Sequence, residues 1–402
     1  MNNSMIARRM QRVRPSPTAT ISDRVRELES AGKGVINLGE GELDFATPER
    51  IGYAGIEAII HHQTKYTAVS GTAELKAAIA HKFVRDNGLH FSAQQIIAGN
   101  GAKQLIFNAL MATVDAGQQV IIPAPYWVSY PDMVTLAEGE PVIVATEEQH
   151  GWKLQPAQLA AALTPESRWL ILNSPGNPTG AVYRARELAA LAEVLVDHPQ
   201  VLIMSDDIYE PLRYGQTPFA TFAEVAPQLA DRVLTVNGVS KSHAMTGWRL
   251  GYAAGPRWLI AAMQTLQSQS TSNPGSISQA AAVVALTQPQ DFFTEWLDKL
   301  NQRRQRVLDM VAATDGLSAQ IPEGAFYIFA NCQQLIGRTT PQGKPLADDK
   351  ALAEWLLAEA QVAVLHGSAF GTPGYLRIAY AVDDTLLDEA CRRLQAACGR
   401  LG

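Results

Sequence analysis

The sequence predicts an α/β protein: a large domain carries a mostly parallel sheet of seven strands between helices, and a smaller α+β domain follows. Seven short runs of apolar and β-branched residues alternate with longer helical patterns, which is typical of crossover connections between parallel strands. In addition, the 402 residues exceed what one hydrophobic core usually serves, and 47% of them are hydrophobic. Two folded domains are therefore expected.

The predicted strands of the large domain are mostly continuous in apolar residues, as expected where helices cover both faces of a sheet. They comprise residues 96–98, 119–123, 141–146, 168–173, 201–205, 232–237 and 250–254. Helices are predicted between them, for example over residues 101–114 and 185–196. Upstream, Thr72 is a candidate N-cap for a helix that ends at Asn87-Gly88. We place the large domain at residues 48–290.

The chain changes character after about residue 290. A long charged helix is predicted over residues 292–312. The elements predicted after it are strands over residues 325–330, 362–365 and 375–379, and helices over residues 350–360 and 386–397. We expect residues 291–402 to form the smaller α+β domain, joined by an N-terminal arm of residues 1–47.

The overall charge excludes two classes of partner. A formal net charge of −6 and a pI near 5.8 give no reason to expect binding to nucleic acid or to an anionic membrane. No apolar run approaches the roughly 18 residues that cross a bilayer, so the chain is expected to be soluble. No metal site is expected either.

The three cysteines, Cys332, Cys391 and Cys398, include no Cys-x-x-Cys pair, and their odd number indicates reduced thiols. A reducing compartment, the cytoplasm, is therefore expected. One feature argues for another location. The first 22 residues contain four arginines, several Ser and Thr and no acid, which is typical of a transit peptide. The alternative is a basic helix or arm that leads into Pro15.

The residues that follow the predicted strands are the place to look for a site, because ligands of an open parallel sheet bind beyond the carboxyl ends of its strands. These segments are rich in Gly, Pro, Asn, aromatic and ionisable residues: 99–103, 125–127, 173–178, 206–209 and 240–241. Together they supply what a pyridoxal 5′-phosphate (PLP) site needs. Such a site requires a lysine for the aldehyde, an anion for the ring nitrogen, a phosphate cradle, a stacking aromatic ring and a cation for the substrate carboxylate.

The candidate for the covalent bond to the aldehyde is Lys241. A lysine beyond a strand end in a buried crevice has a lowered pKa, which makes its amine nucleophilic. Arg249 lies eight positions further on, and a guanidinium suits a phosphate because it binds in a bidentate manner. Taken alone, a lysine followed by an arginine more often lies on a solvated surface.

The turn of Gly101, Ala102 and Lys103 is the candidate phosphate cradle. It lies between a predicted strand and a helix, where backbone N–H groups and a helix N-terminus bind phosphate. An ordinary tight turn is the alternative. The segment matches neither the Walker sequence nor the dinucleotide fingerprint, since Gln104 occupies the third glycine position.

Asp206 follows a predicted buried strand, where a carboxylate needs a partner such as a protonated ring nitrogen. Asp207 is the competing acid, and the alternation of side chains along a strand sends the two in different directions. Tyr209 is a candidate donor to the phenolate oxygen of the cofactor. Its alternative is a packed core tyrosine.

Three further residues complete the candidate set. Asn177 lies in the turn sequence Asn-Pro-Thr-Gly and is a second donor to that phenolate oxygen. Trp127 is a candidate for stacking on the cofactor ring, although most tryptophans belong to the core. Arg377, on the predicted strand 375–379, is a candidate for the α-carboxylate of the substrate.

With these residues assembled, the sequence resembles the class I/II aminotransferases of PLP fold type I, in particular the bacterial aspartate aminotransferase-like branch. The matching stretches span nearly the whole chain in the family's order: residues 65–66, 101–104, 125–131, 173–180, 205–209, 241–251 and 376–380. Any one of them is weak evidence, whereas the set is specific.

The resemblance implies a catalytic role for three residues. Lys241 joins the cofactor aldehyde and then moves protons, and Asp206 pairs with the ring nitrogen. Tyr209, together with Asn177, holds the phenolate oxygen. The activity implied is transfer of an amino group to a 2-oxo acid in a ping-pong cycle.

The resemblance also implies how cofactor and substrate are held. Arg249 and the backbone of residues 101–103 bind the phosphate, and Trp127 stacks on the ring. Gly41 and Arg377 contact the substrate, as do Trp127 and Asn177. Tyr66 reaches the phosphate of the neighbouring subunit, which implies a homodimer with shared active sites.

The substrate is the point on which the sequence is divided. Lys103 matches the lysine with which relatives favour acidic side chains, which indicates aspartate or glutamate as donor and 2-oxoglutarate as acceptor. Relatives usually have a small or apolar residue at Glu40 and a proline at Leu43. A carboxylate at Glu40 would repel an acidic substrate unless a cation such as Lys103 neutralises it. Aromatic, basic or other donors therefore remain alternatives.

Three other classes of function are considered. A same-fold PLP lyase, decarboxylase or oxidase would use the same residues. A transcriptional regulator with an aminotransferase-like domain carries an added DNA-binding domain, which we do not expect in the short segment before Pro15. A dinucleotide enzyme is disfavoured, because the fingerprint is missing.

Overall fold

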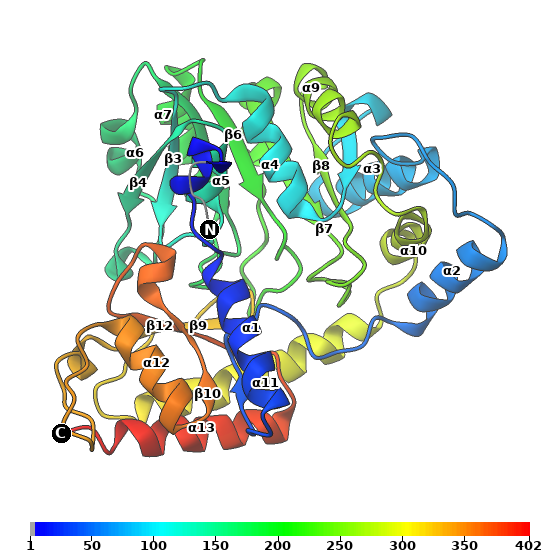
Figure 1. The fold of residues 1–402 in the computed structure, drawn as a ribbon. Coiled ribbons are helices and arrows are strands. Elements are labelled where there is room, and N and C mark those ends of the chain that lie inside the picture. Colours follow the sequence, from blue (N-terminus) through cyan, green and yellow to red (C-terminus); the bar gives the residue numbers. More distant parts are fainter. Residues whose placement is uncertain (1–4) are drawn as a thin grey trace.

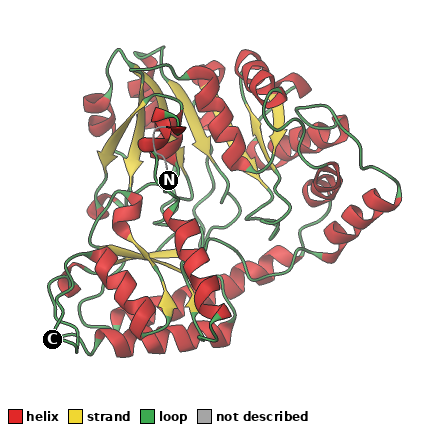
Figure 2. Cartoon of the chain, viewed as in Figure 1, coloured by secondary structure: helices red, strands yellow, loops and turns green. Residues whose placement is uncertain are grey.

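The computed structural model describes residues 5–402 and shows a large sheet flanked by helices, with a smaller sheet beneath it (Figures 1 and 2). Residues 1–4, the start of the basic segment and of the predicted arm, lie outside the described residues. The strands of the large sheet are β2 (Ile96–Gly99), β3 (Gln119–Ala124), β4 (Glu140–Ala145), β5 (Ser167–Asn173), β6 (Leu202–Asp206), β7 (Val233–Gly238) and β8 (Gly251–Ala254).

All seven predicted strands are present, and each end differs from the prediction by at most one residue. The strand order is β2-β8-β7-β6-β5-β3-β4, and neighbours among β3 to β7 run parallel. β8 is antiparallel to both of its neighbours. The reason is its connection: the segment between β7 and β8 contains no helix, whereas a parallel partner needs a long crossover.

The antiparallel course of β8 has a direct consequence for the site. It places the start of β8 at the edge where β7 ends, so that Gly238 pairs with Gly251. Gly251 also pairs with Gly99 at the end of β2. The segments that carry Lys241, Arg249 and residues 101–103 therefore meet at one edge of the sheet.

Helices cover both faces of the large sheet, and alternate strand residues point to opposite faces. One face packs on α4 (Ala102–Thr113), α5 (Tyr130–Leu136) and α9 (Arg257–Ser268). The other face packs on α3 (Ala73–Asn87), α6 (Pro156–Ala162), α7 (Ala185–Val196), α8 (Phe222–Val225) and α10 (Ser276–Thr287). α3 begins at the predicted cap, where the Thr72 side chain accepts a hydrogen bond from the N–H of Leu75, and ends at Gly88.

The smaller sheet is antiparallel and has the order β11-β12-β9. Its elements are β9 (Tyr327–Asn331), β11 (Leu365–His366) and β12 (Tyr375–Ala379), and they pack on α11 (Phe292–Ala312), α12 (Asp349–Glu359) and α13 (Asp384–Cys398). The prediction of a single strand over residues 362–365 is wrong. The segment forms two short pieces, because β10 (Val362–Ala363) pairs with β1 (Ile36–Asn37) while β11 pairs with β12.

The N-terminal segment returns to this smaller unit. β1 runs parallel to β10, and Leu38 accepts a hydrogen bond from the N–H of Ala379. Two of the four arginines, Arg8 and Arg9, lie in a short 3-10 turn, Arg8–Gln11, and α1 (Pro17–Ser30) follows it. α1 and α2 (Glu49–Ile60) are not predicted above. None of the helices among residues 5–402 is long and apolar enough to span a bilayer.

Candidate active site

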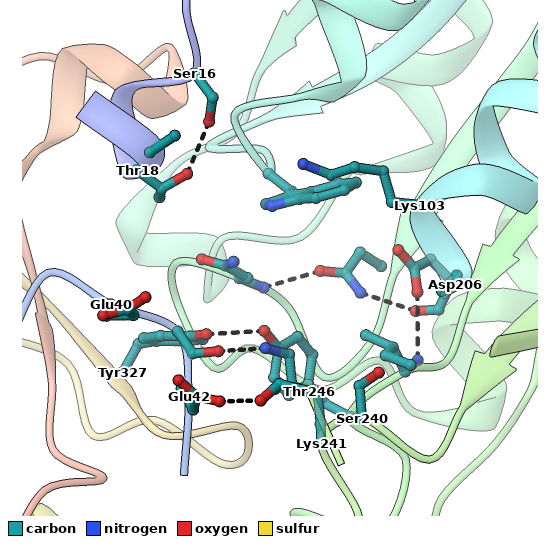
Figure 3. A pocket seen from close by; sticks show the side chains of 18 of the residues that line it. Ser16, Thr18, Glu40, Glu42, Lys103, Asp206, Ser240, Lys241, Thr246 and Tyr327 are labelled. Carbon is teal, nitrogen blue, oxygen red and sulfur yellow. Dashed lines mark hydrogen bonds between the residues drawn. The ribbon is translucent and has the colours of Figure 1, made fainter. Parts of the chain in front are cut away.

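A cavity of about 470 Å³ lies between the carboxyl ends of the large sheet and the smaller unit (Figure 3). Ten of the twelve predicted site residues line it: Gly41, Ala102, Lys103, Trp127, Asn177, Asp206, Tyr209, Lys241, Arg249 and Arg377. Gly101 adjoins the cavity through Ala102. Tyr66 does not line it and is 91% exposed.

Lys241 lines the cavity and is partly buried. Its Nζ donates a hydrogen bond to the carbonyl of Gly41 and lies 5.9 Å from the centre of the Phe326 ring. Burial lowers the pKa of Lys241 to about 8, although the nearby carboxylate of Glu42 acts in the opposite direction. Roughly a tenth of this amine is therefore neutral, and hence nucleophilic, at pH 7.

Asp206 ends β6 and is almost completely buried. Its Oδ2 accepts a hydrogen bond from the hydroxyl of Tyr130 at 2.5 Å, and its Oδ1 accepts a longer one from the N–H of Ile208 at 3.3 Å. Burial raises the pKa of Asp206 to about 6, and the two hydrogen bonds oppose that shift. Asp207 points elsewhere, as alternation requires, and accepts a hydrogen bond from Ser205.

The phosphate cradle predicted at residues 101–103 is shaped by two glycines. Gly101 has a φ of +87° and precedes α4, and a Cβ added there would overlap the guanidinium of Arg249. A Cβ at Gly251 would overlap the backbone of Ala102. Arg249 donates to the carbonyls of Thr246 and Asn100, and it forms no ion pair within residues 5–402. Its charge therefore remains available to an anion beside the N-terminus of α4.

Arg377 is 1% exposed and has no acidic partner among the described residues. It donates to Asn177 Oδ1 at 3.0 Å and to the carbonyl of Gly39 at 2.5 Å, while its Nε has no hydrogen-bond partner. Burial lowers its pKa. A buried guanidinium that lacks a counter-ion is a receptor for a carboxylate, since such a ligand would restore the lost solvation.

Two tyrosines of the site escape prediction from the sequence. The hydroxyl of Tyr327 on β9 lies 2.8 Å from that of Tyr209, and its ring lies 4.5 Å from the guanidinium carbon of Arg377. Tyr130 holds Asp206. It belongs to the matching stretch 125–131, whereas nothing local distinguishes Tyr327 from a core residue of its strand.

The suggestion that Lys103 neutralises the carboxylate of Glu40 is wrong. The structure forms no ion pair between them, and Figure 3 shows the two side chains on opposite sides of the cavity. The Nζ of Lys103 instead lies 4.8 Å from the centre of the Trp127 ring. Burial lowers the pKa of Lys103, and the charge of Arg249 adds to that effect.

Comparison with known proteins agrees with this geometry. Residues 33–394 match the family model described as aminotransferase class I and II. The aspartate/prephenate aminotransferase of Cereibacter sphaeroides is 53% identical over 98% of both chains, and the aspartate aminotransferase of Rhizobium meliloti is 49% identical over 98% of this chain and 96% of its own.

Solved structures give the same result for the fold. The crystal structure of the Rhizobium meliloti aspartate aminotransferase superposes with a TM-score of 0.95 at 49% identity, covering 99% of this chain and 100% of the other. The Thermus thermophilus aspartate aminotransferase with maleate gives 0.90 at 39% identity, covering 98% and 99%. The family and the fold type expected from the sequence are thus confirmed. The chain is an enzyme that belongs to the class I and II aminotransferases.

Proposed function

We propose that this aminotransferase uses PLP and transfers the amino group of aspartate or glutamate to a 2-oxo acid such as 2-oxoglutarate, in a ping-pong cycle. One observation carries the proposal: a partly buried lysine, a buried carboxylate and a buried arginine that has no counter-ion among the described residues line one cavity at Lys241, Asp206 and Arg377. The substrate is supported by the relatives, whose names are aspartate and aspartate/prephenate aminotransferase. Lys103 is the cation proposed to meet the acidic side chain.

The residues fit PLP on features of the structure itself. The buried carboxylate of Asp206 lacks a cationic partner among the described residues, which a protonated ring nitrogen would provide. The glycine cradle at the start of α4 leaves room beside Arg249 that any larger residue would fill. We therefore assign the phosphate to Arg249 and to the backbone of Gly101, Ala102 and Lys103, and the ring to Trp127. When bound, PLP supplies an aldehyde that captures amines and a ring that accepts electrons from the substrate α-carbon.

The other steps of the reaction are assigned to side chains of the protein. The neutral amine of Lys241 would take a proton from the α-carbon of the substrate and hold it for return. The guanidinium of Arg377 holds the α-carboxylate, which fixes the α-hydrogen relative to that amine. The hydroxyl of Tyr209 and the amide of Asn177 would hold the phenolate oxygen of bound PLP, while the backbone of Gly41 would border the substrate.

We further propose a homodimer in which Tyr66 completes the site of the other subunit. α2 lies at the edge of the molecule, and its side chains Tyr53, Ile56, Ile59 and Ile60 are each more than half exposed (Figure 1). An apolar face of this kind is typical of an interface between copies. Mixing Tyr66→Ala protein with Lys241→Ala protein should create one intact site per mixed dimer and restore activity; two inactive proteins that stay inactive after exchange would contradict the shared site.

Two further statements belong to this proposal. We place the enzyme in the cytoplasm, on the strength of its reduced cysteines. We divide the chain into a large cofactor-binding domain of residues 48–290 and a small domain of residues 1–47 and 291–402. The pairing of β1 with β10 supports this division, because it joins the two ends of the chain.

The decisive experiment is the visible absorption spectrum of the purified protein with added PLP. Borohydride reduction should fix the cofactor on Lys241, as mass spectrometry of the peptides would show, and Lys241→Ala should abolish turnover. A panel of amino donors with 2-oxoglutarate then tests the substrate. A colourless protein that takes up no PLP would overturn the proposal, and clear preference for basic or aromatic donors would overturn the substrate.

A further inference from the structure

Two acidic side chains from the segment after β1, Glu40 and Glu42, line the cavity. They differ in their contacts. Glu42 accepts a hydrogen bond from the hydroxyl of Thr246. Glu40 accepts one from Asn37 Nδ2 at 3.1 Å through Oε2, and within residues 5–402 its Oε1 has no hydrogen-bond partner. The Glu40 side chain is solvent-exposed, so this second oxygen is open to water or to a ligand in the cavity.

The backbone holds Glu40 between the two cations on which the reaction depends. The carbonyl of Gly39 accepts a hydrogen bond from Arg377, and the carbonyl of Gly41 accepts one from Lys241. Since neighbouring Cα atoms are about 3.8 Å apart, Glu40 stands within one residue of both contacts. The backbone of Glu40 is therefore held close to Arg377 and Lys241, while its exposed side chain reaches into the cavity.

Four of the other charged residues of the cavity already have roles in the proposed function. Asp206, Lys241, Arg249 and Arg377 serve the cofactor and the α-carboxylate. Two walls remain for the side chain of a substrate: the Lys103 wall, which is cationic, and the Glu40 wall, which is anionic and lies on the opposite side (Figure 3). A further cation that lines the cavity, Arg26, is hydrogen-bonded to Asp23 at 2.6 Å; this bond raises the pKa of Arg26, and the charge of Glu40 adds to that effect.

We propose that Glu40 is a specificity-determining residue that extends the substrate range to amino acids whose side chain ends in an ammonium or a hydroxyl group. This inference rests on the proposed function, since it concerns the same site. An acidic side chain binds at the Lys103 wall and is weakened by repulsion from Glu40. A donor-bearing side chain binds at the Glu40 wall, where Oε1 accepts its hydrogen bond.

The test compares PLP-loaded wild-type enzyme with Glu40→Ala and Glu40→Gln, and uses Glu193→Gln on α7 as the control for loss of an exposed acid. For each, kcat/KM is measured with aspartate and with ornithine, whose side chain ends in an ammonium. Glu40→Ala should shift the ratio of the two kcat/KM values toward aspartate by roughly tenfold, which lies between the effects of unit charges several Å apart in bulk water and near a protein surface. Glu40→Gln should lose the ammonium preference but retain activity with homoserine, because its amide still accepts a hydrogen bond. Glu193→Gln should change nothing.

A second measurement does not depend on turnover. The Kd of maleate, a dicarboxylate, is determined by calorimetry on the same proteins, with the visible spectrum and the Tm as checks that the site is intact. Maleate should bind roughly fivefold more tightly to Glu40→Ala, and the gain should shrink in 0.5 M salt as screening increases. If the enzyme transaminates normally, but neither Glu40 substitution changes the kcat/KM ratio or the Kd of maleate, the role of Glu40 alone is overturned. A wild-type protein that takes up no PLP would overturn the proposed function itself, and this inference with it.

Discussion

A buried ion pair behind the site gives the prediction with the largest effect on stability. The carboxylate of Glu210 receives three donors: the ammonium of Lys82 on α3, Asn87 Nδ2 at 2.7 Å and Asn237 Nδ2 at 2.6 Å. The side chains of Lys82 and Glu210 are only 7% and 8% exposed. Glu210 follows Tyr209 directly, and Asn237 lies on β7 shortly before Lys241. The cluster therefore ties α3 to the two strand ends that carry the site.

Lys82→Met removes the positive charge and leaves the carboxylate buried. Breaking one partner of a buried pair costs about 3–5 kcal/mol, and we expect about 3 kcal/mol here because two amides still donate to Glu210. Glu210→Gln in the Lys82→Met background removes the stranded charge but keeps an acceptor for the amides. It should therefore recover about 2 kcal/mol of that loss.

The free energy of unfolding is measured by urea titration of the wild type, both single variants and the double variant, which form a double-mutant cycle. Lys350→Met is the matched control, since Lys350 and Glu354 form a pair at 3.9 Å whose side chains are 62% and 70% exposed. Lys350→Met should lower the free energy of unfolding by less than about 0.5 kcal/mol. The reasoning is refuted if Lys82→Met lowers the free energy of unfolding by less than about 1 kcal/mol. It is also refuted if adding Glu210→Gln recovers none of the loss, because the buried charge then does not stabilise this cluster.

Four further predictions concern the site. In cofactor-free protein, Lys241 should react with an amine-selective label with a midpoint near pH 8, because burial disfavours its ammonium form; a midpoint near that of an exposed lysine would contradict this. Asp206→Asn should lower kcat about a hundredfold, as the ring nitrogen loses its anionic partner, and unchanged steady-state rates would refute the pairing. Arg377→Lys should raise KM for both substrates at least about tenfold, since a bidentate contact is lost. Gly101→Val should weaken PLP binding in a fluorescence titration, because its side chain would displace Arg249 at a φ of +87°.

Much of the local structure follows from the sequence. The seven strands of the large sheet and the long helix α11 appear where apolar runs and helical periodicity place them. The cap at Thr72 and the stop at Gly88 are likewise local, because each depends on one side chain or one backbone conformation. The same holds for the list of candidate site residues, since these follow strand ends that local pattern identifies.

What the sequence leaves undecided depends on contacts between distant segments. The split of residues 362–365 into two strands is decided by two different partners, β1 and β12, which no local pattern reveals. The antiparallel course of β8, which brings Arg249 beside Lys241, follows from the path of the chain between them.

The hydrogen-bond partners of the site residues also come from distant segments. Arg377 meets Asn177 across 200 positions of the chain, and Tyr209 meets Tyr327 across 118. Sequence alone therefore determined the strands of the large sheet, several of the helices and most residues with the chemistry of the site, because those properties depend on neighbours along the chain. Only the packing of the smaller unit against the large sheet decided which charges remain unpaired, since burial and distance exist only once the two are together.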